Sequence, residues 1–431
     1  KGLVIASALL RQPLFMEPGK QIIPHLFRTE YSKITAVLCR VFGIAHIEIA
    51  EDLVSDTFLL AAETWGLKGA PKNPKAWLYT VAKNKAKDYF KRDNLFTKKI
   101  AAELNAGEKS ILEPEIDLSD KNIGDSQLQM MFAVCHPCIP VESQIGLSLS
   151  ILCGFGVEEI ADAFLSSKES IYKRLSRAKD KLRAEKVQIA IPTAAEIDSR
   201  LGTVLSTLYL LFNEGYYSVS QNAKLRKELC VEAMRLNLLL IENKTTNLPQ
   251  VNALLSLMCF HASRFEARID GKGALVLYEE QDSSLWDKEL IKRGEYFLNA
   301  AATGNEVSKY HLEAAIAYWH THQADSKEKW ESVLQLYNKL LLVEYSPMAA
   351  LNRTFALSKA RDKAIAIAEA EKLDLGANHF YHCLMGDLFT GFDDHKAMQH
   401  LETALSLARS ADDKLSIKKK MDLLKVKNKI F

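Results

Sequence analysis

The sequence from Val157 to Leu182 is VEEIADAFLSSKESIYKRLSRAKDKL. Apolar residues recur at helical spacing on both sides of Leu165-Ser166-Ser167, which predicts two helices joined by a tight turn. Ser166 and Glu169 have the spacing of a capping box, so we expect them to fix the start of the second helix. The stretch therefore predicts a helix-turn-helix, and it guides the interpretation of the segments around it.

The second of these helices carries cations on every face except the apolar one, which holds Ile171, Leu175, Ala178 and Leu182. Short polar residues at the start of a helix, with cations along its exposed side, suit insertion into the major groove of DNA. We expect the first exposed side chains to reach base edges and the later cations to neutralise phosphates. The predicted DNA-binding residues of this helix are Lys168, Ser170, Lys173, Arg174, Arg177 and Lys181. The alternative is a solvated basic face on an ordinary helical hairpin.

Towards the N-terminus, residues 48–65 (EIAEDLVSDTFLLAAETW) predict a strongly amphipathic helix. Leu53, Val54, Phe58 and Ala61 are expected to pack inward. The acids expected outside are Glu51, Asp52, Asp56 and Glu63. Taken alone, such an acidic face most often indicates simple solvation.

Aromatic residues alternate with cations in residues 74–92 (PKAWLYTVAKNKAKDYFKR), which follow a Pro/Gly-rich interruption. Cations that track phosphates, beside rings that stack on unpaired bases, are typical of single-stranded DNA binding. The predicted contacts are Trp77 and the cations Lys72, Lys85, Lys87, Lys91 and Arg92. The alternative is that Trp77, Val81 and Phe90 belong to the core and only the lysines are exposed.

The whole chain of 431 residues has few strand signals, and its helix-period pattern predicts an all-α fold of several domains. Its ordinary apolar (48%) and charged (26%) content excludes wholesale disorder. No apolar run reaches the roughly 18 residues that a membrane helix needs, so we expect no membrane-spanning helix and no membrane partner. The predicted divisions are an N-terminal extension (1–19, with Met16 as the natural start), a helical domain (20–92), an acidic linker (93–126), the helix-turn-helix domain (127–186) and a helical C-terminal region (197–431).

The C-terminal region contains a weak repeat with a period close to that of tetratricopeptide repeats. Three positions recur 33 residues later: Leu351, Phe355 and Ala364 correspond to Leu384, Leu388 and Ala397. Small residues such as Ala397 and Ala404 would let paired helices pack closely. Two copies leave open the alternative that two amphipathic helices align by chance.

The seven cysteines are an odd number scattered through apolar, helix-like runs, which is typical of free thiols in a reducing cytosol. Cys135-His136-Pro137-Cys138 has the spacing of a zinc half-site or a redox pair. No second Cys/His pair follows at a suitable distance, so we expect a structural role there, with no metal and no cofactor. No catalytic constellation stands out, and we expect no enzymatic activity.

Several of these motifs resemble the extracytoplasmic-function (ECF) bacterial sigma factors. They are EDLVSDTF from Glu51, AWLYTVAKN from Ala76, EIADAF from Glu159 and KRLSRAKDKL from Lys173, which occur in the family's order over about residues 20–186. The segments CHPC from Cys135, LYLLFNEGY from Leu208 and EQDSSLWD from Glu280 further resemble the ECF subgroup with a long tetratricopeptide-like C-terminal extension. Lys83 departs from the pattern, because an arginine is common at its position; the change keeps the charge but removes a bidentate fork.

The resemblance implies a role for each segment. Residues 20–92 would be sigma region 2, in which the acidic helix around Asp52 and Asp56 docks on core RNA polymerase. The segment Lys72 to Arg92, with Asn84 and Lys85, would recognise and help to melt the −10 promoter element. Residues 127–186 would be sigma region 4, which reads the −35 element, and the linker 93–126 would thread the channel that later carries RNA.

We therefore expect a cytoplasmic sigma factor whose partners are core RNA polymerase and promoter DNA. A regulatory protein or ligand would act on the C-terminal extension. The alternative is a helix-turn-helix regulator with a helical sensor domain that binds duplex DNA without polymerase. A scaffold built on the C-terminal repeats is a further alternative, and it predicts no DNA affinity.

Overall fold

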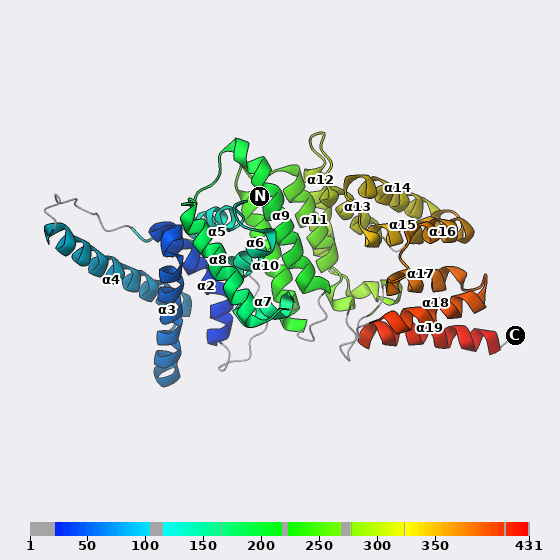
Figure 1. Cartoon of the computed structure of the whole chain (residues 1–431), viewed down its shortest axis with the longest axis horizontal. Helices are drawn as coiled ribbons and strands as arrows, with labels where there is room; N and C mark the ends of the chain where they lie inside the picture. Colours follow the sequence, from blue (N-terminus) through cyan, green and yellow to red (C-terminus); the bar gives the residue numbers. More distant parts are fainter. Residues whose placement is uncertain are drawn as a thin grey trace. The chain divides into compact units, whose positions relative to one another are not determined.

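A computed structural model describes residues 22–103, 115–164, 166–217, 223–268, 276, 278–322, 324–408 and 411–429. Every regular element in these ranges is helical, so the predicted all-α fold is confirmed (Figure 1). The predicted extension 1–19 lies outside the described residues. Within the described ranges, no helix combines the length and the apolar character needed to cross a membrane.

The chain divides into two compact units, and the first consists of residues up to Ser218 together with Asn222–Thr246. Its helices are α2 (Ile22–Phe42), α3 (Ile47–Lys68), α4 (Pro74–Glu103), α5 (Asp120–Val134), α6 (Val141–Leu147), α7 (Val157–Ala163), α8 (Lys168–Ala184), α9 (Ala194–Tyr217) and α10 (Ala223–Glu242), with the short elements η1 (Ile44–His46) and η2 (Ser148–Leu152).

Two glycines in the left-handed region set the bounds of the first helices. Gly43, with φ 84°, follows α2 and donates its N–H to the carbonyl of Cys39. Gly69, with φ 79°, follows α3 and donates to the carbonyl of Trp65 in the same way. Glycine is favoured at both positions because a Cβ would be strained at these angles.

Helix α5 forms the centre of the first unit, where Met130, Met131 and Phe132 are fully buried. It packs against α2 on one side and against α9 and α10 on others. Helices α9 and α10 therefore share a core with the helices that precede them, although the sequence pattern placed residues from 197 onward in a separate region. The packing boundary lies after Thr246 instead.

The predicted linker 93–126 is helical at both ends. Helix α4 continues to Glu103 and α5 begins at Asp120, while residues 104–114 lie outside the described residues. The acids at the end of this stretch start a helix. Asp117 accepts hydrogen bonds from the backbone and side chain of Ser119, and Ser119 is the N-cap of α5. Short polar and acidic residues stabilise a helix N-terminus. Apolar periodicity does not detect a helix start made of such residues.

The second unit contains residues from Asn247 onward. Its elements are α11 (Pro249–Ala262), η3 (Phe265–Ala267), η4 (Tyr278–Glu280), η5 (Ser283–Leu285), α12 (Lys288–Ala301), α13 (Lys309–His320), α14 (Lys327–Val343), α15 (Pro347–Ala360), α16 (Lys363–Ala370), η6 (Glu371–Leu373), α17 (His379–Phe389), α18 (Asp394–Leu407) and α19 (Ala411–Lys429). From α13 to α19 each helix packs on the next along the chain (Figure 1).

The positions expected to repeat fall on corresponding helices of this unit. Leu351 and Leu384 are buried on α15 and α17, and Ala397 and Ala404 are fully buried on α18. Ala364, the expected counterpart of Ala397, is exposed at the start of α16. The spacing therefore matches a succession of helix pairs, although the alanine at the repeated position is buried on α18 and exposed on α16.

We expect Gly294→Ala to destabilise the second unit by about 1–2 kcal/mol. A Cβ on Gly294 of α12 would lie 2.5–2.8 Å from three ring atoms of Phe260, which is fully buried on α11. Overpacking of this kind costs about 1–3 kcal/mol, more than the gain in helix propensity. Chemical denaturation gives the change. Gly202→Ala on α9, where the Cβ meets nothing within 4 Å, is the control and should stabilise by about 0.5–1 kcal/mol. Equal gains for both variants would contradict the packing.

Candidate nucleic-acid interface

Helices α7 and α8 pack against each other across a short turn. The buried residues of α8 are those predicted: Ile171, Leu175, Ala178 and Leu182. The predicted capping box is wrong by one residue, because Ser167 is the N-cap and its Oγ accepts from the backbone N–H of Ser170 at 3.2 Å. Both Ser166 and Ser167 are good N-cap residues, and the backbone geometry, rather than residue type, decides between them.

A groove of about 420 Å³ runs between the start of α6 and one side of α8. Four of the predicted DNA-binding cations line it, together with two hydroxyls: Lys173, Arg174, Arg177, Lys181, Ser143 and Ser170. Among the residues that the structure describes, neither Lys173 nor Arg177 is paired with an acid. The positive charge of this groove is therefore largely available to an anionic partner such as a phosphate chain.

Acids compensate two of the five predicted cations of α8. Lys168 makes an ion pair with Glu158 of α7, and Lys181 pairs with Glu185 at 2.7 Å. The hydrogen bond and charge of Glu185 raise the pKa of Lys181 above its ordinary value. These two lysines are therefore weaker candidates for phosphate contact than Lys173 and Arg177.

The other side of α8 contacts the first helices of the unit. Lys179 Nζ lies 2.5 Å from a carboxylate oxygen of Glu51, and Arg183 lies 2.6 Å from Glu48. Arg183 Nε also donates to the carbonyl of Ala45 at 3.2 Å. Neither Lys179 nor Arg183 is among the predicted DNA-binding residues of this helix. Their spacing on one side of the helix was visible in the sequence, but nothing there identified which acids they would meet.

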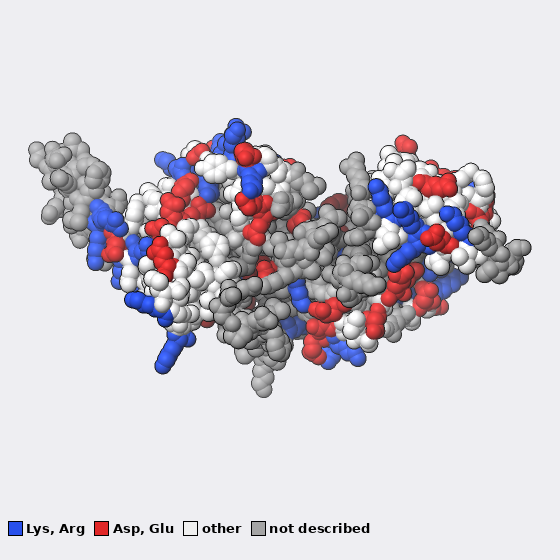
Figure 2. All heavy atoms as spheres, turned by 90° about the horizontal axis from the view of Figure 1, so that it is seen from below, with Lys and Arg blue, Asp and Glu red and all other residues white. Residues whose placement is uncertain are grey.

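Helix α4 carries the second group of predicted DNA-binding residues. Asn84, Lys87 and Lys91 recur at helical spacing along one side, and Asn84 and Lys91 are exposed. Lys72 is exposed in the loop before the helix, and Arg92 is exposed next to Lys91. Figure 2 shows blue side chains gathered along α4, at the left of the view. The structure thus presents most of these cations on an accessible surface.

Two other predicted contacts on α4 are partly occupied by the protein itself. The ring of Trp77 packs edge-to-face on Trp65 of α3, with centroids 5.2 Å apart, and Trp77 is half-buried. This contact favours the alternative in which Trp77 belongs to the core. Lys85 Nζ lies 3.5 Å from a carboxylate oxygen of Asp56, a predicted polymerase contact. The two predicted binding residues therefore meet in the unbound chain.

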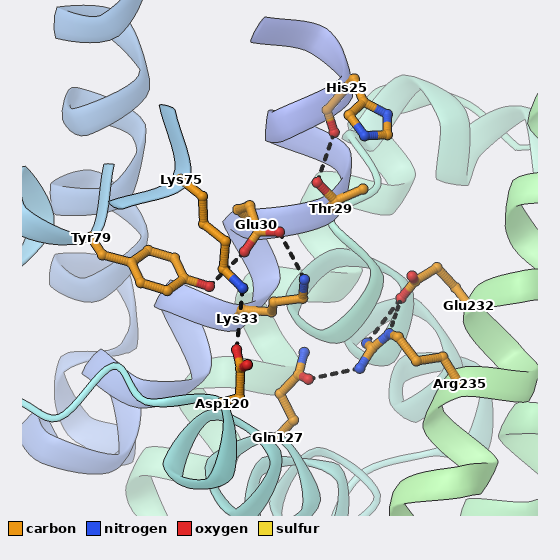
Figure 3. Close-up of polar contacts among 10 residues, drawn as sticks. All are labelled: His25, Thr29, Glu30, Lys33, Lys75, Tyr79, Asp120, Gln127, Glu232 and Arg235. Carbon is orange, nitrogen blue, oxygen red and sulfur yellow. Dashed lines mark hydrogen bonds and ion pairs between the residues drawn. The ribbon is translucent and has the colours of Figure 1, made fainter. Parts of the chain in front are cut away.

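A buried carboxylate holds α4 in place. Glu30 of α2 is only 6% exposed, and it accepts from the Tyr79 hydroxyl at 2.6 Å and from Lys33 at 2.8 Å (Figure 3). Burial, and next the charge of Glu30, raise the pKa of Tyr79, so its hydroxyl remains a donor. Lys75 adds an ion pair with Asp120 of α5 at 3.2 Å (Figure 3). These contacts fix the orientation of α4 on the first unit.

The outer face of α3 combines acids with unusually exposed leucines. Asp52, Asp56 and Glu63 are exposed along it, as predicted. Between and beyond them, Leu59 is 60% exposed and Leu67 is 87% exposed. An acidic surface that also presents leucines is more typical of a protein-binding face than of simple solvation. Glu51, by contrast, points to the flank that α8 covers.

The Cys135-His136-Pro137-Cys138 segment lies at the end of α5. Cys135 is buried, and its Sγ lies 3.7 Å from the hydroxyl of Ser148 and 3.8 Å from that of Thr207. Burial raises the pKa of this thiol, which keeps it protonated and poorly nucleophilic. Cys135 therefore contributes to packing between α5, η2 and α9.

Comparison with known proteins gives two family matches. Residues 26–95 match sigma-70 region 2, and residues 200–302 match a family of unknown function (DUF6596). The uncharacterized protein R00370 of Rhizobium meliloti (strain 1021) is 31% identical over 387 residues, which cover 88% of this chain and 90% of that protein. No solved structure matches the chain significantly.

Proposed function

Because this chain belongs to the sigma-70 family, we propose that it is an ECF-type sigma factor with a helical, tetratricopeptide-like C-terminal extension. Proteins of the sigma-70 family are transcription initiation factors that bring RNA polymerase to promoters, not enzymes. Region 2 accounts for residues 26–95. The observation that carries the ECF-type assignment is the cation-lined groove beside α8. It offers a second candidate DNA-binding surface, and recognition of two promoter elements requires two such surfaces.

In this proposal α8 enters the major groove of the −35 element. Ser170, Lys173 and Arg174 contact base edges near the start of the helix, and Lys168, Arg177 and Lys181 contact phosphates. Affinity for duplex DNA then falls with salt, with a logarithmic slope of about −0.9 for each phosphate contact. The groove between α6 and α8 gives one DNA strand a place to lie.

Helix α4 takes the −10 element in the same proposal. Asn84, Lys87 and Lys91 face the displaced strand. Lys72, in the loop before the helix, and Arg92, next to Lys91, hold phosphates. Trp77 acts mainly by packing on Trp65, and Lys85 joins the DNA contacts when its pair with Asp56 opens. The hydrogen bond between Tyr79 and Glu30 fixes the orientation of α4, so that the side carrying Asn84 and Lys91 faces the DNA.

Core RNA polymerase docks on α3, through Asp52, Asp56 and Glu63 and the exposed leucines between them. Glu51 joins this surface once α8 moves aside. A protein that works on RNA polymerase acts in the cytoplasm, where cysteines that form no disulfide are stable. The second unit, with its succession of helix pairs, offers a surface for a regulatory protein or ligand.

We expect Asp52→Lys combined with Glu63→Lys to weaken binding to core RNA polymerase about tenfold or more. Both acids are exposed on the outer face of α3, and reversed charges would oppose a cationic partner. Fluorescence anisotropy with labelled full-length protein and purified bacterial core polymerase measures the change. Asp198→Lys with Glu306→Lys is the matched control, because it alters the net charge equally at exposed sites elsewhere. Equal losses in both double variants would remove α3 from the proposal.

A further inference from the structure

Helix α8 has two charged sides, and only one of them borders the groove. Lys173, Arg177 and Lys181 line the groove, whereas Lys179 and Arg183 lie four residues apart on a different side. Residues 177 and 179 are about 200° apart around a helix. The contact of Lys179 and Arg183 with α3 and η1 is therefore distinct from the predicted DNA-binding surface. We call this contact the α3–α8 seam.

The seam is well formed. The side chains of Lys179 and Glu51 are 13% and 17% exposed, so this pair is largely shielded from water. Arg183 bridges Glu48 and the carbonyl of Ala45, and the hydrogen bond to Glu48 is the largest cause of its raised pKa. The two cations are four residues apart on α8, and the two acids are three residues apart on α3. Residues at either spacing lie on successive turns of the same side of a helix, so both pairs form together. A shielded pair of this kind resists salt better than an exposed one.

We propose that the flank of α3 formed by Glu48 and Glu51 is a docking site for a cationic helix, and that α8 occupies it until core RNA polymerase displaces α8. The inference rests on the proposed function, since it names the competitor for the polymerase-binding helix. Both acids are already paired with cations of α8, so a cationic helix of a partner can pair with them only after α8 has released them. The site is therefore either closed by the protein's own helix or open to polymerase.

The seam couples the two binding surfaces of the protein. If polymerase binds only the open form, its apparent affinity is reduced by the fraction of molecules that are closed. Release of α8 on binding then frees it to move to a −35 element, whose position relative to α3 the polymerase sets. Duplex binding through Lys173 and Arg177 needs no such release, because the groove lies away from the seam.

A single substitution tests the competition. Lys179→Ala removes the more shielded pair, so we expect core polymerase to bind the full-length variant about three- to tenfold more tightly than the wild type. Lys121→Ala is the matched control: it removes an exposed cation on α5 outside the seam and should leave the affinity unchanged. Unchanged or weaker binding by the Lys179 variant, with normal binding by the wild type, would overturn the inference.

A cross-linking experiment on the wild-type protein tests the same competition between α8 and core polymerase. A zero-length carbodiimide reagent should join Lys179 to Glu51 in the free protein, and saturating core polymerase should suppress that product at least severalfold. The cross-link between Lys181 and Glu185 lies within one end of α8 and serves as the internal control. A Lys179–Glu51 product that persists at full occupancy would overturn the inference. A wild-type chain that binds no polymerase at all would instead overturn the proposed function, and the inference with it.

Discussion

A chain truncated after residue 196 should fail to form the DNA-binding unit, whereas a chain that ends at Thr246 should form it. Helix α9 buries a complete face in the first unit, where Leu201, Val204, Leu205 and Leu208 are at most 1% exposed. Burial of one such side chain contributes about 1.5–3 kcal/mol. Their joint loss is comparable with the whole stability of a typical domain, about 5–15 kcal/mol.

Polar contacts would be lost with the same helix. Arg200 of α9 donates to the carbonyl of Phe132 at the end of α5, and Thr207 lies against Cys135. Circular dichroism melts of the two truncated chains provide the measurement, and duplex DNA binding provides a second readout. The chain ending at Thr246 should melt cooperatively and bind DNA. The chain ending at residue 196 should do neither, and a cooperative, DNA-binding product of that length would contradict the shared core.

Charge reversal of the groove should have the largest effect on DNA binding. We expect Lys173→Glu with Arg174→Glu to lower affinity for promoter duplex at least about 100-fold, because each lost contact costs about 1–3 kcal/mol and the new acids repel phosphates. The salt dependence of the remaining binding should also become shallower. Fluorescence anisotropy with a labelled duplex at several salt concentrations gives both quantities.

The matched control is Lys418→Glu with Lys419→Glu. These neighbouring lysines are exposed on α19 of the second unit, and their reversal changes the net charge by the same amount. Arg174 also packs over the Phe164 ring at 5.6 Å, so a melting curve of the groove variant must show that the first unit is intact. Wild-type affinity in an intact groove variant would favour the scaffold alternative, in which the DNA-binding half has no role.

The sequence predicted which side of each helix is buried better than it predicted which helices meet. The four buried positions of α8 follow from the period of an α-helix, and all four are correct. The same pattern cannot show that Lys179 meets Glu51, 128 residues away. Nor can it show that α9 and α10 complete the core around α5, because an apolar face is equally consistent with any neighbour of suitable shape.

Helix ends and loop composition account for the other differences. The acids near Asp117 and Asp120 predict a linker by composition, yet they start α5, because acids and short polar residues are frequent in both settings. On the outer face of α3, the exposure of Asp52, Asp56 and Glu63 was predicted from the sequence. The exposed leucines of this face were not predicted, although Leu59 lies at the same helical spacing as Asp56 and Glu63. Trp77 illustrates the limit most clearly: a ring suited to stacking on a base is half-buried and also packs on Trp65.

The most direct test of the account is reconstituted transcription. The full-length chain is combined with bacterial core RNA polymerase and a promoter library, and transcript starts are mapped. We expect initiation from a defined set of paired −35 and −10 elements, lost in the Lys173→Glu, Arg174→Glu variant and retained in the Lys418→Glu, Lys419→Glu control. Duplex binding without any binding or redirection of core polymerase would contradict the sigma-factor account and favour a conventional helix-turn-helix regulator.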